Sequence, residues 1–195
     1  MQRVCVFCGS NSGQQPAYRE AARRMGQTLA QNGLGLVYGG GKVEVGLMGA
    51  LADAALEQGA EVIGIIPQAL FEKEVAHTGL SELRVVASMH ERKALMADLA
   101  DGFVALPGGF GTLEEFCEIL TWSQLGIHQK PMGLLNTAGF YTPLLGMFDH
   151  ATQEGFVRPE HRQMILVDEN PAGLLEQMLG YVPAARPKWI SERES

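Results

Sequence analysis

Short apolar runs and helical patterns alternate along nearly the whole chain, and this alternation constrains the fold more than any other feature of the sequence. Strands that are separated by helices pair in parallel, and the helices then cover both faces of the sheet. The sequence therefore predicts a single α/β domain with a doubly wound parallel sheet over residues 1–182, followed by a loosely structured tail over residues 183–195. The predicted strands are residues 3–8, 34–38, 62–66, 83–86, 102–106, 132–135 and 165–167, and the predicted helices are residues 16–31, 46–58, 89–100, 114–125, 143–153 and 171–179.

The composition argues against several classes of protein. A formal net charge of −7, from 15 basic and 22 acidic side chains, argues against a nucleic-acid partner, because such proteins usually carry a basic stripe. The apolar run at residues 1–7 is too short for a signal peptide or a membrane span, so we expect a cytoplasmic protein without a membrane partner. Three cysteines are too few for a disulfide framework, and we expect Cys5 and Cys8 to be small buried residues of the first strand.

One strand–turn–helix junction carries the strongest functional signal. Residues 106–115 read Leu-Pro-Gly-Gly-Phe-Gly-Thr-Leu-Glu-Glu and link the apolar run 102–106 to a helical pattern. Glycines let the backbone approach an anion closely, and the unpaired amides at a helix start point at that anion. Glu114 and Glu115 follow at once, in what we expect to be the first turn of the helix. A loop that only holds phosphate gains nothing from carboxylates, so they indicate chemistry beside the phosphate.

The same residues have a structural interpretation. Thr112 and Glu115 have the spacing of a capping box, in which each side chain satisfies a backbone amide at the helix start. This role is an open alternative to a catalytic role for Glu115. The turn is not the dinucleotide-binding fingerprint, since Glu114 stands where a third glycine would be needed, and the chain lacks the Lys-Ser/Thr phosphate-loop signature.

A second junction, at residues 88–93, places two cations near the start of a helix. Ser88 and Glu91 have capping-box spacing, so Arg92 and Lys93 fall in the first turns, where the helix dipole opposes positive charge. Arg92 also aligns with the apolar side of the helix, and a charge on a core-facing side is almost never left unpaired. We therefore expect Arg92 to face a bound anion; structural pairing with a neighbouring acid is the alternative.

Two further loops at the carboxyl ends of predicted strands are rich in small residues. Residues 9–13 offer amides and hydroxyls, although a simple turn is the plainer interpretation. Residues 39–41 are three consecutive glycines, which indicate close approach of the backbone to another group. Because ligands of parallel α/β folds bind at the carboxyl edge of the sheet, we expect these loops to gather around one site.

The rest of the sequence bears on cofactors and assembly. The five histidines are scattered without metal-ligand spacing, and we predict neither a metal nor a cofactor. The helix over 114–125 has a second apolar side formed by Ile119, Trp122 and Leu125. A helix that is apolar on two sides is buried on two sides, so we predict that this helix lies at a homodimer interface.

Together the two junctions resemble the paired signature of the Lonely Guy (LOG) family, the cytokinin riboside 5′-monophosphate phosphoribohydrolases that were long mislabelled lysine decarboxylases. The resemblance rests on Met-His-Glu-Arg-Lys at 89–93 and Pro-Gly-Gly-Phe-Gly-Thr-Leu-Glu-Glu at 107–115, and it covers nearly the whole chain. It extends to Phe-Cys-Gly-Ser at 7–10 and Val-Tyr-Gly-Gly-Gly at 37–41. The segment 42–45 is longer than the family pattern, which leaves substrate preference near that loop open.

The resemblance implies a Rossmann-like, usually dimeric enzyme that cleaves the N-glycosidic bond of adenosine-type 5′-monophosphates. It implies a catalytic pair, Arg92 and Glu115. Breaking the bond builds positive charge on the ribose, so Glu115 would stabilise that charge or activate water, while Arg92 would hold the phosphate or orient Glu115. The nucleotide-contacting positions that the resemblance implies are Glu74, Arg92, Lys93, Gly108, Gly109, Phe110, Gly111, Thr112, Leu113, Glu114 and Thr121.

Two other functions stay open at this point. A nucleotide-binding or carrier protein of the same fold would bind its ligand without turnover. A decarboxylase would carry pyridoxal phosphate on a lysine such as Lys42 or Lys93, and no other feature of the sequence supports this. Adenine and N6-prenylated adenine are both open as the preferred base.

Overall fold

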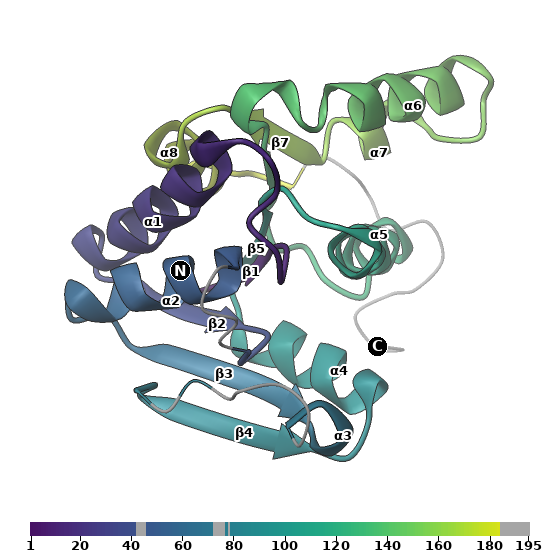
Figure 1. Cartoon of the computed structure of the whole chain (residues 1–195). Helices are drawn as coiled ribbons and strands as arrows, with labels where there is room; N and C mark the ends of the chain where they lie inside the picture. Colours follow the sequence, from purple (N-terminus) through teal and green to yellow (C-terminus); the bar gives the residue numbers. More distant parts are fainter. Residues whose placement is uncertain (42–45, 72–76, 78, 184–195) are drawn as a thin grey trace.

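The computed structural model describes residues 1–41, 46–71, 77 and 79–183, and a parallel sheet with helices on both faces runs through it (Figure 1). Seven strands pair in parallel in the order β4-β3-β2-β1-β5-β6-β7, which confirms the predicted α/β class and doubly wound sheet. The strands are β1 (Arg3–Phe7), β2 (Gly35–Tyr38), β3 (Val62–Pro67), β4 (Glu82–Val86), β5 (Gly102–Ala105), β6 (Met132–Leu135) and β7 (Ile165–Asp168). The helices are α1 (Pro16–Gln31), α2 (Leu47–Glu57), α3 (Gln68–Phe71), α4 (Met89–Leu99), α5 (Phe110–Leu125), the 3₁₀ helix η1 (Thr137–Gly139), α6 (Thr142–Gln153), α7 (Pro159–Arg162) and α8 (Pro171–Leu179).

The chain begins in the middle of the sheet and extends it in both directions. β1 pairs with β2 on one side and with β5 on the other. The chain reaches one edge at β4 and returns through α4 to β5, so the loops after β1 and β5 lie where the strand order reverses. Open α/β sheets bind their ligands at this position.

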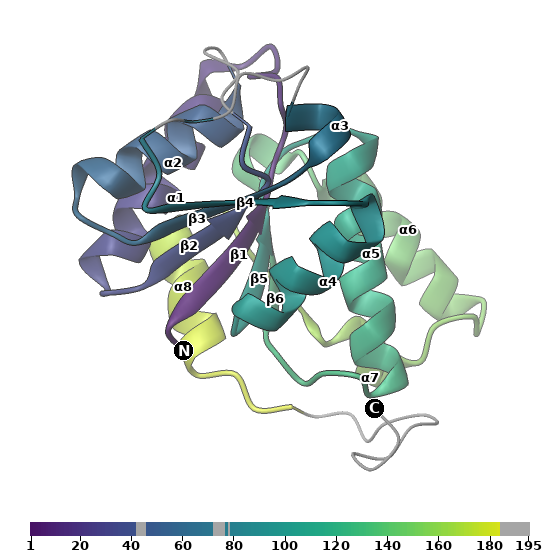
Figure 2. The same cartoon turned by 90° about the horizontal axis from the view of Figure 1, so that it is seen from below.

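The central strand divides the core into two layers. Val4 and Val6 pack into the layer under α1, α2 and α8, whereas Cys5 and Phe7 pack into the layer under α4 and α5. Figure 2 shows α1, α2 and α8 on one side of the sheet and α4, α5 and α6 on the other. A strand that is buried on both faces reads as a continuous apolar run, which is why the sequence pattern located it. Among the described helices, none has both the length and the apolarity needed to span a bilayer.

The helix predicted over 114–125 begins four residues earlier, at Phe110, and Gly109 is its N-cap. The prediction treated Gly111 as part of the turn, but one glycine in a helix costs only about 1 kcal/mol relative to alanine. Thr112 packs so closely over Gly108 that a Cβ atom on Gly108 would collide with the threonine side chain. Position 108 therefore requires glycine. Because α5 begins at Phe110, Glu114 and Glu115 lie in its second turn rather than the first.

The new helix start also removes the structural interpretation of Glu115. Thr112 lies inside α5, so it cannot be the N-cap of a capping box with Glu115. No side chain of the described residues caps this helix. The predicted cap at Ser88 is correct: its Oγ accepts a hydrogen bond of 3.1 Å from the backbone amide of Glu91. The Glu91 carboxylate accepts a hydrogen bond of 2.8 Å from the amide of Ala87 rather than from that of Ser88.

Three short helices, α3, η1 and α7, were absent from the prediction. Each has three or four residues, too few for an amphipathic period to appear in the sequence. Two predicted features lie outside the described residues. They are the segment 42–45, which is longer than in the family pattern, and the tail from residue 184 onward.

Candidate active site

The loops after β1 and β5 meet at the carboxyl edge of the sheet. The backbone amide of Gly9 donates a hydrogen bond of 3.0 Å to the carbonyl of Pro107, and the amide of Leu47 donates one of 3.2 Å to the carbonyl of Gly9. These bonds join the loop after β1, the glycine turn after β5 and the start of α2. The loops predicted to gather at one site therefore do so at the reversal of strand order.

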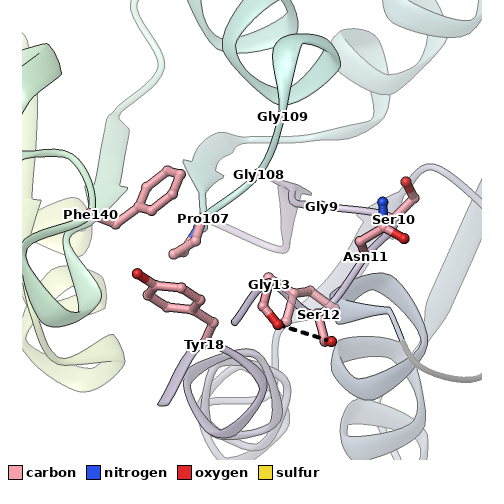
Figure 3. A pocket seen from close by; sticks show the side chains of 11 residues that line it. Gly9, Ser10, Asn11, Ser12, Gly13, Tyr18, Pro107, Gly108, Gly109 and Phe140 are labelled. Atoms are coloured by element: carbon pink, nitrogen blue, oxygen red, sulfur yellow. Dashed lines mark hydrogen bonds between the residues drawn. The ribbon is translucent and has the colours of Figure 1, made fainter. Parts of the chain in front are cut away.

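A pocket of about 300 Å³ opens at this junction (Figure 3). The backbone of Gly108 and Gly109 forms one part of its wall, and the small polar loop at residues 9–13 forms another. Tyr18 and Phe140 form an aromatic side, with ring centroids 5.6 Å apart in an edge-to-face arrangement. The pocket thus places polar loop atoms opposite aromatic rings, next to the start of α5.

The start of α5 is an anion-binding arrangement. The amides of its first turn have no partner inside the helix, and its N-cap, Gly109, offers no side chain that could satisfy them. A Cβ atom on Gly109 would meet no atom within 4 Å, so the space on the side-chain side of Gly109 is open. Sixteen aligned peptide units add the positive end of a helix dipole. The first turn therefore favours an oxyanion such as phosphate.

Arg92 lies where the sequence predicted it, on the core side of α4, and it forms an ion pair with Glu115 of α5. Nη1 of Arg92 is 3.2 Å from Oε1 of Glu115, and both side chains are only 8% exposed. Nε of Arg92 donates a hydrogen bond of 3.1 Å to the carbonyl of Ile65 at the end of β3. Arg92 also passes directly over Gly39, where any Cβ atom would collide with Nη2. The first of the three consecutive glycines is thus required by Arg92.

Two opposing influences act on the pKa of the buried Glu115 carboxylate. Burial raises its pKa, Arg92 lowers it, and the result is a pKa above the ordinary glutamate value. The alternative that Arg92 pairs with a neighbouring acid is correct in part, because its partner Glu115 belongs to the same chain. An ion pair that is this buried is weak evidence for stability, however, since desolvation offsets the attraction between the charges.

Lys93, the next residue of α4, reaches a different set of carboxylates. Its ammonium lies 2.6 Å from Oε1 of Glu114 and 2.9 Å from Oε2 of Glu118. Burial lowers the pKa of Lys93, but the hydrogen bonds to the two carboxylates outweigh burial, and the net pKa lies above the ordinary value. Lys93 is therefore held as a charged ammonium.

Three of the other predicted site residues belong to the first turns of α5, whereas Thr121 lies further along the same helix. Phe110 is 93% exposed beside the glycine turn, and Gly111 is exposed next to it. Leu113 is half-buried against the core. Thr121 lies apart: its hydroxyl donates to the carbonyl of Cys117, and six residues at about 100° each place it on a different helix face from Glu115. Glu74 lies outside the described residues.

Four residues around the site were not predicted from the sequence. Met89 contacts Arg92 through its sulfur, 3.8 Å from Nη1, and Glu118 is the second partner of Lys93. Tyr18 and Phe140 line the pocket. Glu118 could have been found, because it lies four residues after Glu114 and so shares its helix face. No sequence signal brings the two aromatic residues together, since they lie far apart in the chain.

The second apolar side of α5 is only partly available to a partner. Ile119 is buried in the core of this chain, so it is not available to a partner, while the homodimer interface at α5 stays a prediction. Trp122 is half-buried against the same core, and Leu125 is half-buried at the end of the helix. The apolar stripe is wide because α5 packs on the sheet along one face and against neighbouring side chains along another.

The cysteines take the predicted buried positions, and no metal cluster is formed by the described residues. Cys5 and Cys8 are buried free thiols, and burial raises the pKa of each well above the ordinary value, so both stay protonated. Within the described ranges, no three His, Cys, Asp or Glu side chains are placed to hold a metal ion together.

Solved structures share this architecture at low sequence identity. A molybdenum cofactor binding protein from Rippkaea orientalis aligns with a TM-score of 0.69 at 21% identity, over 92% of this chain and 97% of that chain. The Moco carrier protein of Chlamydomonas reinhardtii aligns with a TM-score of 0.69 at 20% identity, over 93% and 99% of the two chains. Such identities establish the fold and nothing further.

Sequence comparison is more specific. The family model described as "Possible lysine decarboxylase" matches residues 48–178. A cytokinin riboside 5′-monophosphate phosphoribohydrolase of Arabidopsis thaliana is 49% identical over 182 residues, which are 93% of this chain and 83% of that protein. The cytokinin riboside 5′-monophosphate phosphoribohydrolase LOG of Oryza sativa subsp. japonica is 48% identical over 182 residues, or 93% and 74% of the two proteins. At this identity and coverage, the chain belongs to the LOG family.

Proposed function

We propose that the protein hydrolyses the N-glycosidic bond of adenosine-type nucleoside 5′-monophosphates and releases the free base and ribose 5-phosphate. The observation that carries this proposal is the buried Arg92–Glu115 ion pair beside the uncapped start of α5. Membership of the LOG family and the names of relatives at 48–49% identity support the same reaction. Those names make cytokinin ribotides, which are N6-modified adenosine 5′-monophosphates, the first substrates to test, with AMP beside them.

The start of α5 is the proposed phosphate site. Its first-turn amides and the open space in front of Gly109 fit a phosphate, and the hydroxyls of Ser10 and Ser12 lie on the other side of the pocket. Binding of the phosphate would hold the scissile bond in place, so remote binding energy would contribute to catalysis. The glycine-turn positions that we assign to nucleotide contact are Gly108, Gly109, Phe110, Gly111, Thr112, Leu113 and Glu114.

Glu115 is the proposed catalytic carboxylate. Departure of the base leaves an oxocarbenium-like ribose, and an ionised carboxylate beside that carbon stabilises the charge or accepts a proton from the attacking water. Arg92 favours the ionised form of Glu115, because its fixed positive charge lowers the pKa that burial raises. Water supplies the hydroxyl that forms ribose 5-phosphate, and its proton balances the charge on the departing base. No cofactor enters this scheme.

The decarboxylase label receives no support from Lys93. A lysine that forms a Schiff base with pyridoxal phosphate must lose its proton. Lys93 is instead held charged between Glu114 and Glu118, which raise its pKa. Lys42 lies outside the described residues.

A homodimer and a cytoplasmic location complete the proposal. Trp122 and Leu125 remain half-buried on α5, and Thr121 is exposed beside them, so Thr121 would reach a nucleotide across a dimer. Glu74 stays a predicted nucleotide contact. Three free cysteines fit a reducing compartment such as the cytoplasm. Sedimentation at micromolar concentration tests the assembly, and a stable monomer would count against it.

The test of the reaction is incubation with AMP, an N6-isopentenyl AMP and the matching nucleosides, with detection of free base and ribose 5-phosphate. We expect release from the monophosphates and far less from the nucleosides. Binding of monophosphates without any release would instead identify a nucleotide carrier.

A variant of the turn tests the phosphate site. Gly109→Ala should keep the melting temperature, since its Cβ meets no atom of the protein, but should weaken binding of monophosphates. Gly146→Ala on α6 is the control, because a Cβ there also meets no atom within 4 Å and α6 does not line the pocket. Equal affinity of the Gly109→Ala variant and wild type, measured by calorimetry, would remove the phosphate from this position.

A further inference from the structure

Two consecutive cations of α4 contact three carboxylates of α5. Arg92 pairs with Glu115 at 3.2 Å, and Lys93 pairs with Glu114 at 2.6 Å and with Glu118 at 2.9 Å. The Lys93 side chain is 10% exposed, whereas the side chains of Glu118 and Glu114 are 25% and 54% exposed. A buried ammonium needs charged partners, and here both partners come from the helix that carries Glu115.

The Lys93 ammonium spans one turn of α5. Glu114 and Glu118 are four residues apart and lie one above the other on the same helix face. Glu115 belongs to the turn between them. A cation that binds both carboxylates therefore fixes where this turn of α5 lies along the helix axis and how it is rotated relative to α4. It thereby also fixes the distance between Glu115 and Arg92.

Lys93 also balances the charge around Glu115. Burial is the largest influence that raises the pKa of Glu115; the two α5 carboxylates raise it further, whereas the α4 cations lower it. The thiols of Cys5 on β1 and of Cys8 just after it stay neutral because burial raises their own pKa values. The charged and titratable groups around Glu115 are Arg92 and Lys93 on α4, Glu114 and Glu118 on α5, and these two thiols.

We propose that Lys93 is a positioning residue that acts through Glu114 and Glu118 to hold Glu115 against Arg92. This inference rests on the proposed hydrolysis, and it differs from the nucleotide-contacting role that the family resemblance implies for Lys93. The ammonium pairs with two α5 carboxylates within the protein, so a positioning role requires no contact with the nucleotide. The two roles predict different kinetics.

The central variant is Lys93→Met, which keeps the length of the side chain and removes its charge. We expect kcat for AMP or N6-isopentenyl AMP to fall about tenfold or more, because a small displacement of a catalytic group has a large effect on rate. The KM should stay within about twofold, since no contact to the nucleotide is lost. The acid limb of kcat/KM against pH should move to higher pH, because Glu115 then faces two carboxylates without a balancing ammonium.

Two further variants sharpen the test. Glu118→Gln removes a negative neighbour of Glu115, so its acid limb should move to lower pH, opposite to that of Lys93→Met. Lys93→Arg keeps the charge and should recover most of kcat. Lys130→Met is the matched control, because the Lys130 ammonium also binds α4, at the carbonyl of Ala97 with a distance of 2.8 Å, but contacts no α5 carboxylate in the described structure. It should change neither kcat nor the acid limb.

A tenfold or larger rise in KM for Lys93→Met, with kcat and the acid limb unchanged, would overturn the positioning role and favour a nucleotide contact. A second readout does not depend on turnover: the carboxyl ¹³C resonance of Glu115, assigned by its loss in Glu115→Gln, followed through a pH titration. Its pKa should rise in Lys93→Met and fall in Glu118→Gln. If the wild type hydrolyses no nucleotide but these shifts appear, the proposed reaction fails and the positioning role stands. Absence of both shifts overturns the positioning role, and the Glu118→Gln titration decides it alone if Lys93→Met does not fold.

Discussion

Two arginine–glutamate ion pairs occupy opposite kinds of environment in this protein. On the edge strand β4, Nε of Arg84 lies 2.8 Å from Oε1 of Glu82, and the side chains are 36% and 48% exposed. At the carboxyl edge of the sheet, Arg92 and Glu115 are 3.2 Å apart and only 8% exposed. The exposed pair has the shorter distance and a second hydrogen bond of 3.2 Å from Nη2 of Arg84. Geometry alone would rank it as the better interaction.

The two pairs differ in how much hydration their charged groups lose when the pair forms. Water screens the β4 pair, so neither its formation nor its loss changes stability much. The buried pair has lost the hydration of both charges, and replacing such a pair by apolar side chains is often neutral or stabilising. Optimising stability does not account for a buried pair on the edge of the sheet where ligands bind. Its location and its raised glutamate pKa support the proposal that the pair serves chemistry.

The largest expected effect follows from removing the buried charge. Glu115→Gln keeps the shape and hydrogen bonding of the side chain but cannot stabilise a developing cation, so turnover should fall about a hundredfold or more. Nucleotide binding and fold should persist. Hydrolysis of AMP or N6-isopentenyl AMP and calorimetric binding check this, with the melting temperature as control. Undiminished turnover would end the catalytic assignment of Glu115.

The pH dependence is the next largest expected effect. Because burial raises the pKa of Glu115 in spite of Arg92, the side chain takes up its proton at a higher pH than an ordinary glutamate does. Activity that requires the ionised form should therefore decline, as the pH falls, already above the usual glutamate pKa. A profile of kcat/KM against pH measures this, and an acid limb at or below that value would contradict the assignment.

The smallest expected effect belongs to the exposed pair. The hydrogen bond to Arg84 lowers the pKa of Glu82, yet both groups remain in contact with water. Glu82→Gln and Arg84→Gln should leave the melting temperature and turnover unchanged within error. Thermal denaturation and the same hydrolysis assay provide the check. A clear loss of activity in either variant would mean that the β4 edge takes part in the site.

The sheet and the burial of Arg92 could both be predicted from the sequence. The alternation of apolar runs and helices predicts the sheet, because strands buried on both faces leave continuous apolar segments. The position of Arg92 among apolar residues of its helix predicts a buried, paired guanidinium. Both signals are local in the chain, which is why they could be read without a structure.

The remaining features depend on contacts between distant segments. Gly109 and Gly111 read as turn residues, so the pattern alone placed the start of α5 four residues too late. Tyr18 and Phe140 become neighbours only when α1 and η1 fold onto the same edge. Glu118 acquires its role only because α4 brings Lys93 beside it. Sequence periodicity reports which face of an element is buried, but not which residue of another element it meets.

The most direct test of the central claim is a double replacement of the buried pair, Arg92→Met with Glu115→Leu, measured for stability and turnover on the same sample. We predict an unfolding free energy within about 1 kcal/mol of wild type or above it, because the apolar pair avoids desolvating two charges while Ile65 loses one donor. Hydrolysis of the nucleoside 5′-monophosphate should be lost. A double variant that is destabilised by more than about 3 kcal/mol, or one that still hydrolyses its substrate, would contradict the conclusion that this ion pair is kept for catalysis rather than for the fold.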